Sequence, residues 1–287
     1  MDNPRVMSAL KPVKRSVLRL TLGKWFYRTR RYASWYWPGK RYADKPALHA
    51  GRLPYTIFTH RTPTLRKLKD VDMWLQHNKV HNLKLACSKL DGVIIRPGET
   101  LSYWRTIGNP SKRRGYVEGM VLYFGTFKPG YGGGLCQLSN LIYWMTLHSP
   151  LTVTERHRHS YDVFPDANRK LPFGSGATCA YNYLDLQICN TTEACYQLCL
   201  RVADNELVGS WRSDAVPVHT YKVYEKAHRM QAEPWGAYTR HNEIWRHVYN
   251  MDAGLVKDEY ITENHALMMY EPLLAEAAGP AADVQQA

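Results

Sequence analysis

Hydrophobic residues at helical spacing follow a run of three glycines near the middle of the chain. The run is Gly132-Gly133-Gly134, and apolar residues then recur at Leu138, Leu141, Ile142 and Met145. This spacing predicts a mostly buried helix that begins at about Cys136. The glycines before it favour a turn in which the backbone takes positive φ and other groups approach closely.

Apolar residues in short runs and in alternation predict strands on both sides of this helix. Before it, the pattern favours strands at residues 52–60, 93–95 and 116–127, and helices near residues 64–75 and 80–90. After it, strands are expected at 151–164, 177–188 and 195–202, with further alternation beyond residue 219. The predicted fold is therefore α+β, with a mixed or antiparallel sheet packed on the central helix.

Composition divides the chain into three parts. Residues 1–50 combine Lys and Arg with Trp, Tyr and Phe, which predicts a basic aromatic N-terminal arm. A helix over residues 13–32 of this arm would scatter its apolar residues around a basic surface. We expect the main domain at residues 51–272, and a disordered Ala-rich tail at residues 273–287.

The charge balance favours acidic partners. The chain has 38 Lys and Arg against 25 Asp and Glu, a formal net charge of +13. No helix-turn-helix, zinc-finger or RNP pattern accompanies these charges, so nucleic acid is not an expected partner. Basic residues with Trp and Tyr in the arm suit an anionic membrane surface. The alternative is an arm that packs on the main domain through its aromatic side chains.

The expected location is the cytoplasm. No apolar run approaches the length needed to cross a bilayer, and the N-terminus has no signal-peptide core. Six cysteines at irregular spacing fit reduced thiols better than a disulfide framework. If the arm binds lipid, the protein would be peripheral at the inner face of the membrane.

Cys136 falls where a thiol can become reactive. Free backbone N–H groups and the helix dipole at the start of a helix stabilise an anion. A thiol placed there ionises more readily, and the thiolate is the nucleophile. The other interpretation is structural: Cys136 is a small buried residue, and the glycines form only a tight turn.

Two histidines on the following predicted strand are candidate bases. His157 and His159 are two residues apart, so in a regular strand they face the same way. A strand packed on the helix would bring an imidazole within hydrogen-bond reach of the sulfur. A third polar group would fix the imidazole tautomer, and three candidates stay open: Asp162, Asp166 and Asp185. The alternative is a solvated edge strand.

Neither a metal nor a cofactor is expected. Four cysteines lie close together in sequence, at Cys179, Cys189, Cys195 and Cys199. Zinc sites usually begin with a Cys-x-x-Cys turn, and none is present, so small buried residues are the favoured interpretation. Residues 239–247 form a different polar cluster, in which Arg240 would suit a carboxylate or phosphate. That cluster could equally hold the C-terminus to the core.

Several motifs resemble the VanW family. They are Pro97-Gly98-Glu99-Thr100-Leu101-Ser102, Arg114-Gly115-Tyr116, Gly132-Gly133-Gly134-Leu135-Cys136-Gln137, and Glu155-Arg156 with His159-Ser160. Residues 240–246 and 262–264 are similar to the family's C-terminal part, so the resemblance covers about residues 59–272. It implies an accessory role in vancomycin resistance, in a setting of D-Ala-D-Ala and D-Ala-D-Lac or D-Ala-D-Ser cell-wall precursors. The sequence departs from the family at residues 174–177, Gly-Ser-Gly-Ala, where many relatives carry an acidic residue.

Together these features suggest a thiol-dependent enzyme acting on peptide or acyl bonds of cell-wall precursors. Cys136 would be the nucleophile, His159 the base because it falls on the family pattern, and the N–H groups of Cys136 and Gln137 the oxyanion donors. The substrate contacts would be Gly133, Gly134, Arg156, Ser160, Arg240, His241 and Asn242. The order of elements also resembles transglutaminase-like and NlpC-like thiol enzymes. The alternative is a non-catalytic module that binds a peptidoglycan precursor or a resistance enzyme, with Gln137, Arg156 and Arg240 as contacts.

Overall fold

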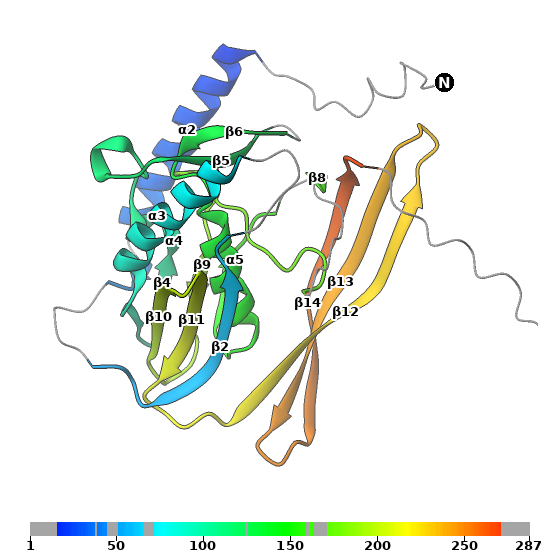
Figure 1. Ribbon diagram of the computed structural model, residues 1–287. Coiled ribbons are helices and arrows are strands. Elements are labelled where there is room, and N and C mark those ends of the chain that lie inside the picture. Colours follow the sequence, from blue (N-terminus) through cyan, green and yellow to red (C-terminus); the bar gives the residue numbers. More distant parts are fainter. Residues whose placement is uncertain are drawn as a thin grey trace, which may run out of the picture.

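The computed structural model describes residues 16–37, 39–44, 51–65, 72–123, 126–158, 161–162 and 171–270 (Figure 1). Within these ranges the chain is a mixed α+β protein, as expected. Its strands form three four-stranded sheets and one two-stranded hairpin rather than a single sheet. The predicted tail, residues 273–287, lies outside these ranges, as do residues 1–15 and 45–50 of the predicted arm.

The helix predicted after the glycine run is α5, Cys136–Leu147. From Leu138 to Leu147 almost every side chain is buried, because the helix packs on one sheet and is covered from other sides. Gly209 lets it approach β11 (Glu206–Ser213) closely: a Cβ there would lie 2.8 Å from Met145 Cε and 2.9 Å from Leu141 Cδ2. The central position of the helix therefore depends on a small residue in the sheet.

The sheet beneath α5 is antiparallel throughout. Its order is β2 (Tyr55–Pro63), β11, β10 (Tyr196–Ala203) and β3 (Ile94–Ile95). Along β11, buried and partly exposed positions alternate, which is the pattern of a strand with one face on the core. Asp204 and Asn205 both take positive φ in the tight turn between β10 and β11, as such two-residue hairpin turns require.

A second four-stranded sheet includes β7 as one of its edge strands. Its order is β1 (Arg41–Tyr42), β4 (Glu99–Ser102), β9 (Gln187–Cys189) and β7 (Thr152–Glu155). Short helical segments follow β4: α4 (Tyr103–Ile107) and η1 (Lys112–Arg114). The two-stranded hairpin, β5 (Glu118–Tyr123) with β6 (Thr126–Tyr131), then leads into the glycine run.

The C-terminal sheet consists of long strands. Its order is β12 (His219–Ala232), β13 (Tyr238–Asn250), β14 (Leu255–Met268) and the short β8 (Tyr161–Asp162), which pairs parallel to β14. These strands run along one side of the molecule (Figure 1). Arg246 on β13 links them to the core: it donates to the carbonyl oxygens of Leu147 at 3.1 Å and Ser149 at 2.8 Å. The C-terminal end of α5 is thus capped by a distant strand.

The other long helices differ from the sequence prediction in their limits. The arm contains α2 (Val17–Tyr36), which begins four residues later than predicted and ends four residues later. The region of the two helices expected before residue 90 contains α3 (Met73–Leu90), which is continuous through residues 76–79, where a break was predicted. No helix in the described ranges is long and apolar enough to span a bilayer.

The predicted strand at residues 151–164 is wrong in its middle. β7 ends at Glu155, and residues 156–158 are irregular, so His157 does not belong to a regular strand face. The strand predicted at 177–188 is also mostly irregular, with only its end in β9. Loop contacts take the backbone groups at the start of this segment. Asn140 Oδ1 accepts from Ala177 N at 2.8 Å, Ser139 Oγ donates to Ala177 O at 2.7 Å, and Thr178 N donates to the carbonyl oxygen of His157 at 2.8 Å.

Candidate functional site

The three glycines before α5 are required by packing on both sides. A Cβ on Gly133 would lie 2.1 Å from the carbonyl carbon of Gly119 on β5. Gly134 has φ +89°, and a Cβ there would lie 2.2 Å from Lys79 Cγ on α3. Gly133 and Gly134, predicted to line a ligand site, therefore contact protein backbone and side chain. Their positions fix the turn that delivers Cys136 to the start of the helix.

Asn82 on α3 holds this turn in place. It is fully buried, and its Nδ2 donates to the carbonyl oxygens of Gly133 and Val117, each at 3.0 Å. Its Oδ1 accepts from Val117 N at 3.0 Å. One side chain thus pairs with three backbone groups on two segments, so the hairpin and the glycine turn are fixed relative to α3.

Cys136 is the first residue of α5, as predicted, and is partly buried. Its thiol donates a long hydrogen bond, 3.8 Å, to the carbonyl oxygen of Cys179. Burial raises the pKa of this thiol, and hydrogen bonds with the backbone of Cys179 and of Cys136 itself offset only part of that rise. In the free protein at neutral pH the sulfur is therefore a thiol, which needs a base to become a nucleophile.

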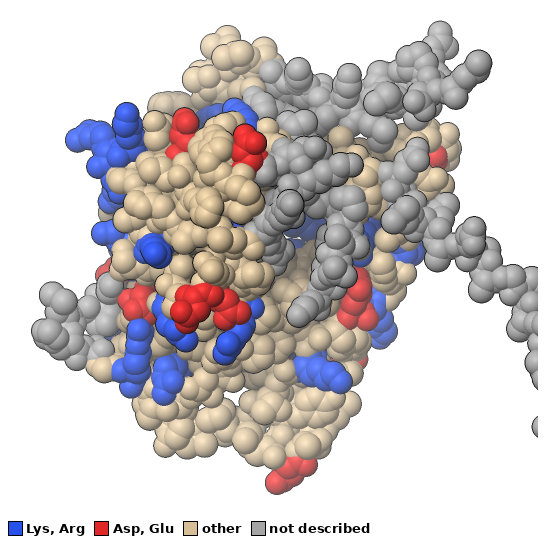
Figure 2. All heavy atoms as spheres, in the orientation of Figure 1, with Lys and Arg blue, Asp and Glu red and all other residues tan. Residues whose placement is uncertain are grey.

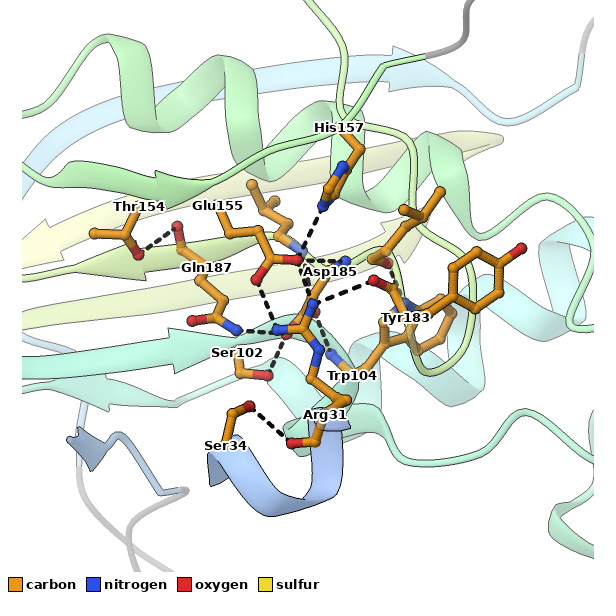
Figure 3. A network of polar contacts seen from close by, with 12 residues as sticks. Arg31, Ser34, Ser102, Trp104, Thr154, Glu155, His157, Tyr183, Asp185 and Gln187 are labelled. Carbon is orange, nitrogen blue, oxygen red and sulfur yellow. Dashed lines mark hydrogen bonds and ion pairs between the residues drawn. The ribbon is translucent and has the colours of Figure 1, made fainter. Parts of the chain in front are cut away.

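Glu155, at the end of β7, is the centre of a polar network that faces the arm (Figure 3). His157 Nε2 contacts Glu155 Oε1 at 3.0 Å, and two guanidinium nitrogens of Arg31 on α2 contact its two oxygens. Burial alone would raise the pKa of Glu155. The hydrogen bonds from His157 and Arg31 and the charge of Arg31 outweigh burial and lower this pKa from 4.5 to about 2. Glu155 is therefore a carboxylate that orients an imidazole.

Asp185 belongs to the same network but has a structural role. It is fully buried and accepts from Ser102 Oγ at 2.6 Å and from the Trp104 amide at 3.0 Å. Burial raises the pKa of this carboxyl group. Asp185 therefore ties the start of α4 to the segment before β9, and its contacts do not include His157 (Figure 3).

The loop after β7 and the segment before β9 connect His157 to Cys136. The Thr178 amide donates to the carbonyl oxygen of His157 at 2.8 Å. The next residue, Cys179, is the one whose carbonyl oxygen accepts from the Cys136 thiol. Cys136, the 178–179 segment and the histidine loop thus form one contiguous group. The side chain of His157 is 37% exposed, so its imidazole is open to solvent on one side.

Gln137 is occupied by contacts to β2. Its Nε2 donates to Thr62 Oγ1 at 3.0 Å and to the carbonyl oxygen of Pro63 at 2.9 Å. Its backbone N–H donates to the carbonyl oxygen of Gly134 at 3.1 Å. Of the two N–H groups predicted as oxyanion donors, the one on Gln137 therefore already has a partner.

Three of the predicted binding residues, Arg156, Asn242 and Arg240, come together where β13 and β14 meet the 173–177 segment. Arg156 donates to the carbonyl oxygens of Gly174 and Gly176, the latter at 2.9 Å, and to Asn264 Oδ1 at 3.2 Å. Asn242 donates to the carbonyl oxygen of Phe173 at 2.7 Å, and accepts from Asn264 at 2.9 Å. These contacts pin the segment between α5 and the C-terminal sheet.

Arg240 lies in the same region and is buried. Its Nε donates to His228 Nε2 at 2.9 Å, its Nη1 lies 3.5 Å from Asp162 Oδ2, and its guanidinium lies over the Phe173 ring at 4.5 Å. His241, one residue on, does not share these contacts: its imidazole contacts His265 and Thr239. Successive residues of β13 therefore face opposite sides, which separates His241 from its predicted neighbours.

Three residues of the sequence hypothesis lie outside the described part of the chain: His159, Ser160 and Asp166. Their roles stay predictions. Among the residues that are placed, no three His, Cys, Asp or Glu side chains meet in a way that could hold a metal ion.

Sequence reasoning missed Glu155, Arg31 and Asn82. The signal for Glu155 was present, since it lies two residues before His157. The signal for Asn82 was weaker: Gln76, Lys79 and Asn82 interrupt the apolar face of α3 at helical spacing, and all three are buried. Arg31 lies 124 residues from Glu155, and no local pattern indicates their contact.

The fold and this site define a class of mixed α+β protein in which a Gly-Gly-Gly-Leu-Cys-Gln turn opens a buried central helix. The family model described as "VanW like protein" matches residues 78–212, which include the turn, α5 and β7. The chain is 36% identical over 186 residues to "Vancomycin B-type resistance protein VanW" of Enterococcus faecalis, which covers 65% of this chain and 68% of that protein. It therefore belongs to the VanW family.

A second relative is more distant. The chain is 26% identical over 113 residues to "Uncharacterized protein YoaR" of Bacillus subtilis, a match that spans 39% of this chain and 36% of that protein. No solved structure matches the chain.

Proposed function

We propose that this protein is an accessory factor in glycopeptide resistance and acts by thiol chemistry on peptide or acyl bonds of cell-wall precursors. The relative from Enterococcus faecalis supports the first part, because its name assigns it to vancomycin resistance and the identity extends over two thirds of its length. One observation carries the second part. Cys136, at the start of α5, belongs to the same contiguous group as a histidine oriented by a carboxylate.

The raised pKa of the Cys136 thiol favours general-base activation over a preformed thiolate. When His157 Nε2 donates to Glu155, Nδ1 carries a lone pair and can accept the thiol proton. The sulfur then attacks the acyl carbon, and the imidazolium returns the proton to the leaving amine. The resulting thioester is passed to water or to a second amine. The N–H group of Cys136 is the proposed oxyanion donor.

The base in this proposal is either His157 or His159. The family pattern favours His159, whereas the contact with Glu155 favours His157. A helix-borne cysteine followed by a histidine in the next β segment is also the order of elements in transglutaminase-like and NlpC-like enzymes. That analogy supports acyl chemistry as the reaction class and says nothing about the substrate.

The proposed location is the cytoplasm. Six cysteines at irregular spacing favour a reducing compartment. A thiol nucleophile keeps its activity there, because glutathione-type buffers maintain it in the reduced form.

The test is capture of an acyl-enzyme. Purified protein is mixed with a peptidoglycan stem peptide ending in D-Ala-D-Ala or with the corresponding depsipeptide, and its intact mass is measured after acid quench. We expect an adduct that maps to Cys136 and disappears in Cys136→Ala, while the matched variant Cys189→Ala keeps it. His157→Ala and His159→Ala are compared to identify the base. The variant that lacks the base should form the adduct about a hundredfold more slowly, or slower still.

Two results together would reject the catalytic proposal. One is the absence of any adduct at Cys136 with either peptide. The other is resistance in cells that survives Cys136→Ser but is lost with Arg156→Ala in a protein that remains folded. That pair of results would indicate a non-catalytic module that binds a precursor or a resistance enzyme.

A further inference from the structure

Helix α2 carries an apolar stripe that the rest of the described chain does not cover. Leu18, Leu22, Trp25 and Phe26 follow one another at intervals of four, three and one residues, which places them on one face of a helix. Their exposed fractions are 70%, 57%, 69% and 55%. Tyr36, at the other end of the same face, is also exposed. Val17 and Tyr27 are also exposed but lie off this face, so the stripe is accompanied by the scattered apolar residues expected from the sequence.

The opposite side of α2 is attached to the body, and this fixes how the helix is rotated. Trp35 is buried, Arg31 pairs with Glu155, and Arg28 Nη2 donates to the carbonyl oxygen of Tyr181 at 3.3 Å. Tyr32 and Tyr181 also share a hydrogen bond between their hydroxyl groups. Arg31 lies on the side of the helix opposite Leu22, and Tyr32 borders the stripe beside Trp25, so the stripe, with Leu22 at its centre, faces outward.

The charge around the stripe is of one sign. Between Val17 and Tyr36 there are five basic residues and no Asp or Glu: Arg19, Lys24, Arg28, Arg30 and Arg31. Burial raises the pKa of Tyr181, and the charges of Arg28 and of Arg114 in η1 act in the opposite direction, so both lie near this phenol. The exposed residues Lys112–Arg114 therefore extend the positive surface beside α2. Figure 2 shows Lys and Arg at the left edge of the molecule, beside the position of α2 in Figure 1.

We propose that α2 lies in the plane of a membrane surface that contains anionic lipid, with the face of Leu18, Leu22 and Trp25 inserted among the acyl chains. A helix of this length spans about 30 Å, and its basic residues would reach the headgroup phosphates on either side of the inserted face. Charge complementarity favours this occupant, since the exposed surface of α2 carries four cations, Arg19, Lys24, Arg28 and Arg30, and no acid, which matches a negatively charged bilayer. Trp25, Tyr36 and Trp37 suit the interface between headgroups and acyl chains.

This placement has a consequence for the site at α5. Arg31 projects from the attached side of α2 to Glu155, the carboxylate that contacts His157. A membrane bound to the outer side of α2 would therefore lie about one helix diameter from that network, roughly 10–12 Å. Substrates carried on a lipid would be presented beside the candidate site.

The experiment uses the full chain and flotation with vesicles. Vesicles of phosphatidylcholine mixed with phosphatidylglycerol are compared with vesicles of phosphatidylcholine alone, at low and at physiological salt. We expect binding to the anionic vesicles that weakens as salt rises. Trp25→Ser should lower partitioning about tenfold. Trp235→Ser, at an exposed tryptophan on the β12–β13 turn, should leave partitioning unchanged.

A second pair of variants tests the charge. The double change Arg19→Gln with Arg30→Gln should lower partitioning roughly thirtyfold, since each cation near an anionic surface contributes about a fivefold factor. The control is Arg201→Gln with Arg229→Gln, two exposed arginines on β10 and β12. Circular dichroism confirms that every variant is folded.

Three results would overturn the proposal. They are equal binding to neutral and anionic vesicles, no binding to either, or an equal loss in Trp25→Ser and Trp235→Ser. If the wild-type chain instead self-associates in size-exclusion chromatography, and Trp25→Ser abolishes that association, the stripe is a contact between protein copies. None of these measurements depends on Cys136, so the proposal stands or fails separately from the thiol chemistry.

Discussion

Arg31 on α2 and Glu155 at the end of β7 form a two-pronged ion pair across 124 residues of sequence. Both side chains are mostly buried, with 12% and 21% of their surfaces exposed. The pair attaches the N-terminal helix to the body, and the same carboxylate orients His157. One contact therefore couples the stability of the arm to the geometry of the candidate site.

Breaking this pair should make the protein less stable, and the loss should depend on pH. The pKa of Glu155 falls from 4.5 to about 2 on folding, so its stabilising contribution is present above pH 4.5 and is lost as pH falls toward 2. Arg31→Gln should lower the free energy of unfolding by about 2–3 kcal/mol near neutral pH. The difference in this free energy between Arg31→Gln and wild type should shrink as pH falls from 4.5 toward 2. Urea unfolding at a series of pH values measures it.

The matched control for that series is Arg105→Gln. Arg105 pairs with Asp44, whose side chain is 78% exposed, at 2.9 Å. Exposed pairs contribute about 0–1 kcal/mol, so this variant should stay close to wild type at every pH. If the stability difference between Arg31→Gln and wild type is the same at neutral pH and at pH 3, the proposed dependence on Glu155 ionisation is contradicted.

The Cys136 thiol should react slowly with iodoacetamide at neutral pH. Burial raises its pKa above the ordinary value of 9.0, so less than about one thiol in a hundred is ionised at pH 7. The rate of alkylation at this residue, followed by peptide mass mapping, should rise with pH and show its inflection above pH 9. Cys136→Ala identifies the signal. An inflection near pH 6 or 7 would mean that a nearby cation already holds the thiolate.

Adding a Cβ to the glycine turn should be strongly destabilising. A Cβ on Gly133 would overlap the backbone of Gly119, and Gly134 combines positive φ with contact to Lys79. Gly133→Ala and Gly134→Ala should each lower the free energy of unfolding by about 2–3 kcal/mol or more. Gly51→Ala is the control, because no atom lies within 4 Å of a Cβ there and it should be neutral. Thermal denaturation in which Gly133→Ala matches wild type would rule out this packing.

Asn82→Ala should remove three hydrogen bonds from the buried support of the same turn. Leaving the backbone groups of Val117 and Gly133 unpaired should cost about 2–4 kcal/mol. Asn78→Ala, one turn earlier on α3, removes one hydrogen bond, a 2.7 Å contact with the Glu118 carbonyl oxygen near the surface. It should cost about 0.5–1 kcal/mol. Equal losses for the two variants, measured by chemical denaturation, would show that the support is not centred on Asn82.

The parts of the fold that the sequence predicts are those set by local patterns. The period of apolar residues places α5 and its start at Cys136 correctly, and alternation locates β2 and β10 to within a few residues. Local patterns fail at residues 156–158 and 177–186, which alternate like strands. There, the backbone of Ala177 pairs with side chains of α5 and Thr178 N pairs with the carbonyl oxygen of His157, contacts that depend on tertiary packing.

The candidate site was predictable in part for the same reason. Cys136 and the histidine loop carry recognisable chemistry, and Glu155 stands at the even spacing that an extended chain requires. The roles proposed for Arg156 and Asn242 came from residue type and from their place in the family motifs. Residue type cannot reveal that backbone carbonyls of residues 173–176 accept their hydrogen bonds.

The capping of α5 by Arg246 also depends on the order in which the chain is synthesised. The carbonyl oxygens of Leu147 and Ser149 receive their guanidinium partner from a residue 99 and 97 positions later. During synthesis, the ribosome releases α5 before β13, so the nascent helix lacks this cap until residues 238–250 have also emerged.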